Sequence, residues 1–206
     1  MSTAGSNDPR THDFKPLTGV EFKPWPKIAR LNRDIIITEK IDGTNAAIGI
    51  TEDREVYAQS RTRIITPEKD NFGFARWVHD NAQALFTALG PGIHFGEWYG
   101  LGIQRGYGLT ERRFALFNTT RYEHWPFTAL GLPSVNIVPK LYEGPYDQTM
   151  IDACLDVLRE NGSAVGSGPA EGIVVFHTAA GMMFKVTLEG DGEPKSVRVA
   201  RESVTA

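Results

Sequence analysis

The chain has 206 residues, enough for one well-buried domain or one domain with a short appendage, but not for a large second domain. Its 41% hydrophobic and 23% charged residues are typical of a globular protein and exclude a disordered or fibrous chain. The formal net charge of −3 gives no overall attraction to nucleic acid, so such a contact must come from a local basic patch.

The cysteine content and the hydropathy pattern indicate in which cellular compartment the protein is expected. Cys154 is the single cysteine, which excludes an intrachain disulfide and a zinc site built from several cysteines. No apolar run approaches the roughly 18 residues of a membrane-spanning helix, and the N-terminus lacks a signal-peptide pattern. We therefore expect a cytoplasmic protein with no membrane partner. The five histidines show no metal-ligand spacing and receive no role.

The first predicted elements surround a lysine. Residues 1–13 are small and polar, bury too little apolar surface to become ordered, and predict a flexible tail. The β-branched run 34–39 predicts a buried strand, and residues 45–50 predict a second strand. Asp42-Gly43 is a strong turn signal between them, so Lys40 should lie at or beside a strand-to-strand turn.

The middle and end of the chain add helices and further strands. A helical pattern predicts one amphipathic helix within 66–90, and a second is expected at about 147–160. Residues 100–108 are glycine-rich without the setting of a dinucleotide or P-loop site, and predict a mobile loop. Short strands are expected at 93–98, 113–117, 134–141, 172–177, 182–187 and 196–200. Many strands, few helices and no regular βαβ alternation predict an α+β protein with antiparallel sheets.

The run Lys40-Ile41-Asp42-Gly43 provides groups that covalent nucleotide transfer requires. That reaction needs an amine to attack the α-phosphate, cations near the phosphates, carboxylates for a metal and a slot for the base. The apolar strand before Lys40 would favour the neutral amine. Asp42 can accept hydrogen bonds or bind a ribose hydroxyl, and Gly43 permits a close backbone approach. The tetrapeptide alone is weak, because a solvated lysine before a hairpin turn explains it equally well.

The longer run Thr38-Glu-Lys-Ile-Asp-Gly-Thr-Asn45 resembles the first nucleotidyltransferase motif of the ATP-dependent RNA ligase family. In that family Asn stands where many DNA ligases have Arg. The resemblance implies that Lys40 becomes adenylylated. It also implies nucleotide-binding roles for neighbouring residues, namely Thr38, Glu39, Asp42, Gly43 and Asn45.

Further motifs of that family follow in the expected order. The resemblance implies that Arg61 engages the phosphate region, that Glu97 meets the ribose and that Phe117 stacks on the adenine. It implies that Glu171 works with the metal and the phosphates, and that Lys185 is the first lysine of the last motif. Each residue alone has an ordinary structural role available to it, such as a solvated arginine or a core phenylalanine. Their joint order favours the functional interpretation.

Two departures from the family pattern affect the expected activity. The last motif usually carries Lys-x-Lys, whereas Thr187 stands in the second lysine position here, and Lys195 could substitute for that cation. The chain also ends about twenty residues past Lys185, so we expect the C-terminal accessory domain of many relatives to be absent. The substrate would then be held by the catalytic domain or by a partner.

The resemblance implies an α+β nucleotidyltransferase domain of the ligase (ATP-grasp-like) type, with antiparallel sheets and flanking helices, over residues 14–206. It implies ATP with Mg²⁺ or Mn²⁺, a lysyl-AMP intermediate, AMP transfer to a 5′-phosphate and joining to a 3′-hydroxyl, as in RNA repair. Expected partners are RNA ends or a nicked duplex, with DNA and a helper protein or domain in trans as further candidates. Local basic residues are weaker candidates for nucleic-acid contact, namely Arg105, Arg112, Arg113, Lys195 and Arg198.

Other functions remain open at this point. A compact DNA ligase or a capping-type guanylyltransferase is disfavoured by Asn45 and by the run around Glu97. A nucleotide-binding or nucleic-acid-binding module that has lost ligation is the alternative from another functional class.

Overall fold

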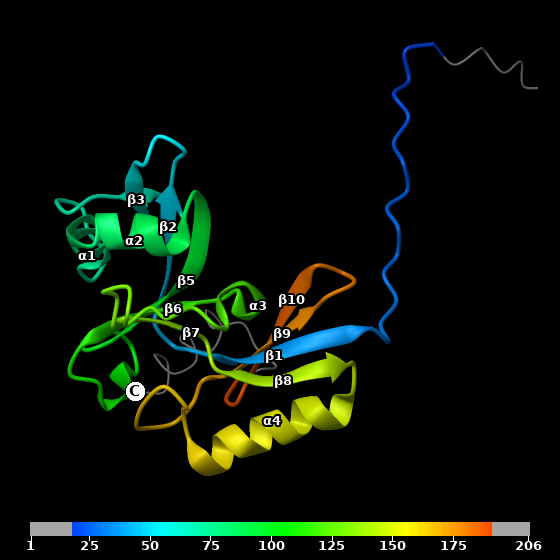
Figure 1. Cartoon of the computed structure of the whole chain (residues 1–206). Coiled ribbons are helices and arrows are strands. Elements are labelled where there is room, and N and C mark those ends of the chain that lie inside the picture. Colours follow the sequence, from blue (N-terminus) through cyan, green and yellow to red (C-terminus); the bar gives the residue numbers. More distant parts are fainter. Residues whose placement is uncertain (1–17, 191–206) are drawn as a thin grey trace, which may run out of the picture.

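Residues 18–190 are described by the structure, a computed structural model, and they form two β-sheets with helices packed against them (Figure 1). The four-stranded sheet has the order β10-β9-β1-β8, and its neighbouring strands are antiparallel. Its strands are β1 (Asp34–Lys40), β8 (Lys140–Pro145), β9 (Gly172–His177) and β10 (Met182–Thr187). Three of these strands, β1, β9 and β10, match the sequence prediction closely.

The six-stranded sheet has the order β4-β3-β2-β5-β6-β7. Every neighbouring pair is antiparallel except β6 and β7, which are parallel. Its strands are β2 (Thr44–Ile50), β3 (Val56–Ser60), β4 (Ile64–Ile65), β5 (Gly92–Gly100), β6 (Arg112–Leu116) and β7 (Val135–Ile137). The expected α+β class with predominantly antiparallel sheets is confirmed, whereas β3 and β4 were not predicted from the sequence.

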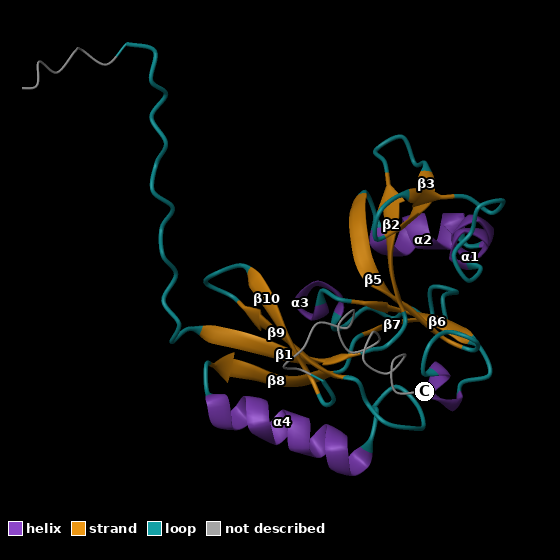
Figure 2. Cartoon of the chain, turned by 180° about the vertical axis from the view of Figure 1, so that it is seen from behind, coloured by secondary structure: helices purple, strands orange, loops and turns teal. Residues whose placement is uncertain are grey.

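Helix α4 (Gln148–Asn161) covers one face of the four-stranded sheet, as seen from behind in Figure 2. The β-branched residues Ile35 and Ile37 of β1 are fully buried there against the apolar stripe of α4, which includes Leu155 and Leu158. Asp147 caps the helix, because its carboxylate accepts a hydrogen bond from the Thr149 N–H. The predicted second helix is therefore confirmed.

The predicted single helix within 66–90 is wrong, because the chain forms α1 (Phe74–Asp80) and α2 (Ala82–Leu89) instead. The carboxylate of Asp70 accepts hydrogen bonds from three backbone N–H groups between residues 71 and 76. These bonds hold the residues just before α1 in a turn. The amide of Asn81 donates to the carbonyl of Trp77 at the break between the helices. Phe74 and Trp77 carry the apolar stripe into the core of the six-stranded sheet.

The predicted strand over 134–141 is also wrong. It divides into β7 and β8, which belong to different sheets. Pro139 lies between them and has no N–H to donate to a sheet, so the ladder is interrupted where the chain crosses over. The turn at Asp42-Gly43 likewise leads from one sheet to the other, since β1 and β2 have different pairing partners.

Other expectations concern the ends of the chain. The tail over 1–13 and the strand over 196–200 lie outside the described residues, so the expected domain over 14–206 stays a prediction. No helix among the described residues has both the length and the apolar character needed to cross a membrane. Residues 18–33 precede β1 as an exposed segment without helix or strand, and Figure 1 shows them extending away from the two sheets.

Candidate active site

Lys40 is the last residue of β1, where the chain leaves the four-stranded sheet. The next residue, Ile41, is buried with Tyr99 and Tyr107, which anchors the backbone beside the lysine. The Nζ of Lys40 lies 2.5 Å from Oε2 of Glu171, and these side chains are only 25% and 14% exposed. The described structure therefore brings together the predicted nucleophile and the predicted metal-associated carboxylate.

Gly172, the residue after Glu171, allows β9 to pack closely between β1 and β10 beside Lys40. It lies opposite Lys40 in the register of β1 and β9, and opposite Thr187 in β10. Its φ is +155°, and a Cβ placed there would lie 2.1 Å from the carbonyl oxygen of Val186. A glycine is required because the neighbouring strand leaves no room for a side chain. The same rung of the sheet thus holds Lys40 and Thr187, with no side chain between them.

Glu97 of β5 meets the lysine motif from the other sheet. Its Oε1 accepts a hydrogen bond of 3.2 Å from the N–H of Gly43, and Asn45 is its direct partner across β2 and β5. A Cβ on Gly43 would lie 2.5 Å from the carbonyl oxygen of Trp98, so the expected close backbone approach exists. Burial raises the pKa of Glu97 to about 7, while the positive charge of Lys40 opposes this shift.

Asp42 is fixed by two residues of the glycine-rich segment. Its N–H donates to the hydroxyl of Tyr107 at 2.6 Å, and its Oδ2 lies 3.2 Å from Nε of Arg105. Ile103 and Tyr107 are buried, so the prediction of a mobile loop over 100–108 is wrong: the segment is packed against the site. Sequence reasoning missed Tyr107, because a tyrosine between glycines carries no distinctive signal.

Phe117 follows β6 and packs, partly buried, against the cluster that contains Ile41 and Tyr107. Its N–H donates to the carbonyl of Phe95, which fixes its backbone beside β5. This position, next to Glu97 on the neighbouring strand, suits a ring that forms one wall of a slot for a base. The structure therefore brings Phe117 to the same region as Lys40.

Glu39 occupies a different environment from Lys40. It is 1% exposed, and its carboxylate accepts hydrogen bonds from Ser163 Oγ at 2.5 Å and from the Ala164 N–H at 2.9 Å. Successive residues of a strand point to opposite faces, so Glu39 and Lys40 diverge, whereas Thr38 shares the face of Lys40. Burial raises the pKa of Glu39. In this structure Glu39 holds the 163–164 loop rather than contacting the lysine.

Lys185 and Arg61 lie at the periphery of the site. Lys185 is exposed on β10, opposite Val174, which in turn lies opposite Thr38 in β1. It is therefore two rungs of the sheet away from Lys40, on the same face. Arg61 is exposed directly after β3, in the other sheet. Both cations remain free to turn toward a bound phosphate, as long side chains on a surface do.

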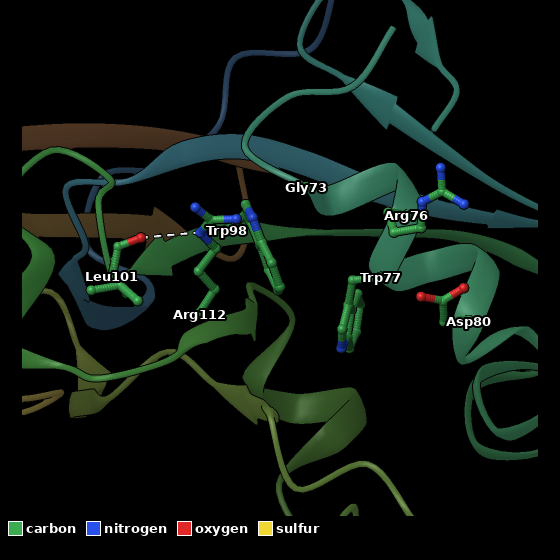
Figure 3. Close-up of a pocket in the computed structure, with 7 residues that line it drawn as sticks. All are labelled: Gly73, Arg76, Trp77, Asp80, Trp98, Leu101 and Arg112. Atoms are coloured by element: carbon green, nitrogen blue, oxygen red, sulfur yellow. Dashed lines mark hydrogen bonds between the residues drawn. The ribbon is translucent and has the colours of Figure 1, made fainter. Parts of the chain in front are cut away.

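The other basic candidates are dispersed. Arg113 pairs with Glu111 at 2.8 Å. Arg112 donates to the carbonyls of Leu101 and Phe72 and lines a surface groove beside α1 (Figure 3). That groove lies on the face of β5 that Trp98 occupies, opposite to the face of Glu97. Lys195 and Arg198 lie outside the described residues.

Glu171 contacts Lys40, and the charges of Lys40, Glu171 and Asp42 all act on the buried carboxyl of Glu97 and influence its pKa. Within 18–190 there is no cluster of three or more His, Cys, Asp or Glu side chains arranged to hold a metal by themselves. Carboxylate oxygens are the donors that Mg²⁺ and Mn²⁺ prefer, and Mg²⁺ commonly uses only one or two of them together with waters and phosphates. The donor set fits such an ion.

Comparisons with known proteins identify the family and the fold. A sequence profile of the RNA ligase family matches residues 33–187. The structure is similar to a mutant RNA ligase of Naegleria gruberi with ATP and Mn, at a TM-score of 0.59 and 18% identity, over 77% of this chain and 51% of that one. Another mutant of that ligase, with AMP and Mn, matches at a TM-score of 0.57 and 18% identity, over 76% of this chain and 50% of that one.

The chain spans about half the length of these solved ligases, and the likeness shows a shared fold. The expected ligase-type nucleotidyltransferase fold is thereby confirmed. No curated protein matches the chain.

Proposed function

The chain belongs to the RNA ligase family, and we propose that it is an ATP-dependent RNA ligase that acts through a lysyl-AMP intermediate on Lys40. The observation that carries the proposal is the 2.5 Å contact between Lys40 Nζ and Glu171 Oε2, placed where Glu97 and Phe117 converge from the other sheet. An amine beside a carboxylate, next to a recognition surface for a nucleoside, is the arrangement that covalent nucleotide transfer needs.

In the first step the Lys40 amine attacks the α-phosphorus of ATP. A phosphorus–nitrogen bond forms, the bond from the α-phosphorus to the bridging oxygen breaks, and pyrophosphate leaves. The ammonium must lose its proton before the attack, and Glu171 Oε2 is already within hydrogen-bond distance to accept it. Glu171 therefore acts as the base and also keeps the amine pointed into the site.

The nucleotide would be held mainly by the six-stranded sheet. Phe117 would stack on the adenine, and Glu97 with Asn45 would hydrogen-bond to the ribose side of the nucleotide. Tyr107 and Arg105 fix the Asp42 backbone and carboxylate, so the turn after the nucleophile is already in place before ATP binds.

ATP and Mg²⁺ or Mn²⁺ are the proposed cofactors, and the Naegleria gruberi structures named with ATP and Mn support this. Glu171 would hold the ion together with substrate phosphates and water. The bound ion would neutralise charge on the phosphates. Lys185 and Arg61 would add positive charge from the two sheets.

In the second step an oxygen of an RNA 5′-phosphate attacks the phosphorus of lysyl-AMP, which breaks the phosphorus–nitrogen bond and returns the amine. In the third step a 3′-hydroxyl oxygen attacks the activated 5′-phosphorus and AMP leaves. Lys185 lies two rungs away from Lys40 on the same face, where it could contact either phosphate. Thr187 contributes no charge to its rung, so these later steps depend more heavily on Lys185.

The first test is self-labelling with ATP. The protein is incubated with α-³²P ATP or α-³²P GTP and Mg²⁺, denatured in neutral detergent because the phosphorus–nitrogen bond is labile in acid, and separated on a gel. We expect label from ATP, none from GTP, and none in Lys40→Ala. No label with either nucleotide would contradict an active nucleotidyltransferase and favour a binding module, while label from GTP alone would indicate a capping-type enzyme.

The second test concerns the nucleic acid. Nicked duplexes that differ only in RNA or DNA on the 3′-hydroxyl side are offered to the adenylylated protein. We expect sealing with an RNA 3′-hydroxyl and much less with DNA. Preferential sealing of an all-DNA nick would replace the proposal with a compact DNA ligase.

A further inference from the structure

The segment over residues 18–33, here called the N-terminal arm, has an unusual exposed composition. Its large apolar side chains are 61–85% exposed, including Phe22 and Trp25, each at 85%. It also carries four cations, Lys23, Lys27, Arg30 and Arg33, against the single acid Glu21. The arm is therefore positive by three charges in a chain whose formal net charge is −3.

The arm has a three-residue period. Apolar side chains recur at Phe22, Trp25, Ile28 and Leu31, and basic side chains recur at Lys27, Arg30 and Arg33. Pro24 and Pro26 favour an extended polyproline II conformation, which has three residues per turn. In that conformation the apolar residues form one stripe along the arm and the basic residues form a second, parallel stripe.

Only the root of the arm is attached to the fold. Leu31 O lies 2.8 Å from Nε2 of His177, and Arg33 O accepts a 2.9 Å hydrogen bond from the N–H of Tyr146. For residues 18–30 the structure records no hydrogen bond or ion pair within the described chain. Both views of the molecule show this segment standing clear of the sheets (Figures 1 and 2).

The arm is connected to the candidate active site by one face of the four-stranded sheet. Every second rung lies on the face of Lys40: toward the arm, this face carries first Thr38, Val174 and Lys185, and then Ile36, Phe176 and Met183. Met183 is 65% exposed and Phe176 is partly exposed, so this face offers apolar surface beyond Lys185. β1 spans roughly 20 Å between the arm and Lys40, at about 3.4 Å per residue.

We propose that the N-terminal arm binds the single-stranded part of a polynucleotide whose reactive end lies at Lys40, an inference that rests on the proposed ligase function. A nucleic-acid strand presents bases along one side and phosphates along the other. The bases match the apolar stripe of the arm, and the phosphates match its basic stripe. Phe22 and Trp25 stack on bases, while Lys27, Arg30 and Arg33 neutralise phosphates. The interleaved positive charge favours this polyanionic occupant over a protein surface.

The test measures binding of a fluorescent, 5′-phosphorylated single-stranded oligouridylate to the full chain by anisotropy. The double variant Phe22→Ala/Trp25→Ala removes the stacking residues, and its control Ile64→Ala/Val157→Ala removes two exposed apolar side chains from β4 and α4. We expect the dissociation constant to rise at least about ten-fold in the arm variant, because stacking contributes substantially for each base. The control should bind like the wild type.

A second pair of variants tests the basic stripe. Lys27→Ala/Arg30→Ala should reduce the slope of log affinity against log salt by about 1.4, since each single-strand phosphate contact contributes roughly 0.7. The control Lys69→Ala/Arg159→Ala removes two exposed cations elsewhere and should leave the slope unchanged. Wild-type affinity and slope in both arm variants would overturn the proposal.

Two further measurements concern the oligomeric state of the protein and the labelling of Lys40. Sedimentation should show the same oligomeric state for wild type and arm variants. Loss of a dimer in the variants would identify a second copy as the occupant and overturn the proposal.

ATP labelling of Lys40 should be equal in all variants. If the wild type takes no label, the ligase function fails; if it labels but the arm variants bind RNA normally, the arm proposal alone fails.

Discussion

The two sheets contribute different kinds of group to the site. The four-stranded sheet carries the charged groups, with Lys40, Glu171 and Lys185 at the ends of its strands or on its exposed face. The six-stranded sheet carries Glu97 and, after β6, Phe117, both partly or largely buried. The first sheet therefore presents the lysine and its paired carboxylate, whereas the second presents a largely buried wall. Under the proposed function, the first sheet would carry the reaction and the second would recognise the nucleotide.

The largest expected effect comes from Glu171→Gln on the reacting sheet. The amide cannot accept the lysine proton, so the rate of AMP transfer to Lys40 should fall roughly 10²-fold to 10³-fold. Binding of the nucleoside part of ATP should change little because the recognition sheet is intact, whereas binding of the metal ion that Glu171 would hold should weaken. Rapid-quench labelling at saturating ATP measures the rate, and Glu160→Gln on the exposed side of α4 is the matched control. A normal rate in Glu171→Gln would show that Glu171 is not the base for Lys40.

Glu97→Gln tests whether Glu97 of the second sheet is buried, through the pH dependence of protein stability. Burial raises the pKa of Glu97 from 4.5 to about 7, so the folded protein holds this proton more tightly than the unfolded chain. Ionisation between about pH 4.5 and 7 therefore lowers the stability of the wild type. The variant should match the wild type below pH 4.5 and exceed it by roughly 2–3 kcal/mol above pH 7. Urea unfolding at several pH values measures this, and a pH-independent difference would contradict it.

Glu39→Ala separates the reacting face of the first sheet from its structural face. The variant leaves the Ser163 hydroxyl and the Ala164 N–H without their buried acceptor, which should cost about 2 kcal/mol of stability. Urea denaturation measures the loss, with the exposed Glu160→Ala as the control. The folded fraction should still label with ATP. Full stability together with weak ATP binding would instead make Glu39 a nucleotide ligand, as the motif resemblance implies.

Substitution of Phe117 should have the smallest of these effects and should change only the affinity for ATP. Phe117→Leu keeps apolar bulk but loses the ring, and should weaken ATP binding about ten-fold with little change in the rate at saturation. Phe117→Tyr keeps the ring and should bind like the wild type. Calorimetric titration with an α,β-methylene ATP analogue measures affinity without transfer. Equal affinities in the two variants would show that no base stacks on this ring.

The sequence predicts the four-stranded sheet, which carries Lys40, better than the six-stranded sheet, which carries Glu97. Lys40, Glu171 and Lys185 lie in β-branched or Gly-flanked runs with clear strand and turn signals, and β1, β9 and β10 formed where expected. Local patterns do not reveal which sheet a strand joins, so the crossover at Pro139 was missed. Tyr107 was missed for a related reason: its contact with Asp42 joins residues that are 65 positions apart.

The buried environment of Glu39 shows a second limit of sequence reasoning. The motif resemblance implies a role for each residue from Thr38 to Asn45, but the alternation of a strand sends neighbouring side chains to opposite faces. Lys40 and Thr38 share the reacting face, while Glu39 is held by a loop more than 120 residues away in sequence. The identity of the motif is visible in the sequence, whereas the division of labour within it requires the fold.

The most direct test of the division between the two sheets is to locate the covalent nucleotide. Wild-type protein is incubated with ATP and Mg²⁺, digested, and its AMP-bearing peptide is sequenced by mass spectrometry. We expect AMP on Lys40, at the end of β1, and no adduct in Lys40→Arg even though that variant still binds ATP. An adduct on any other residue, or on Lys40→Arg protein, would contradict it.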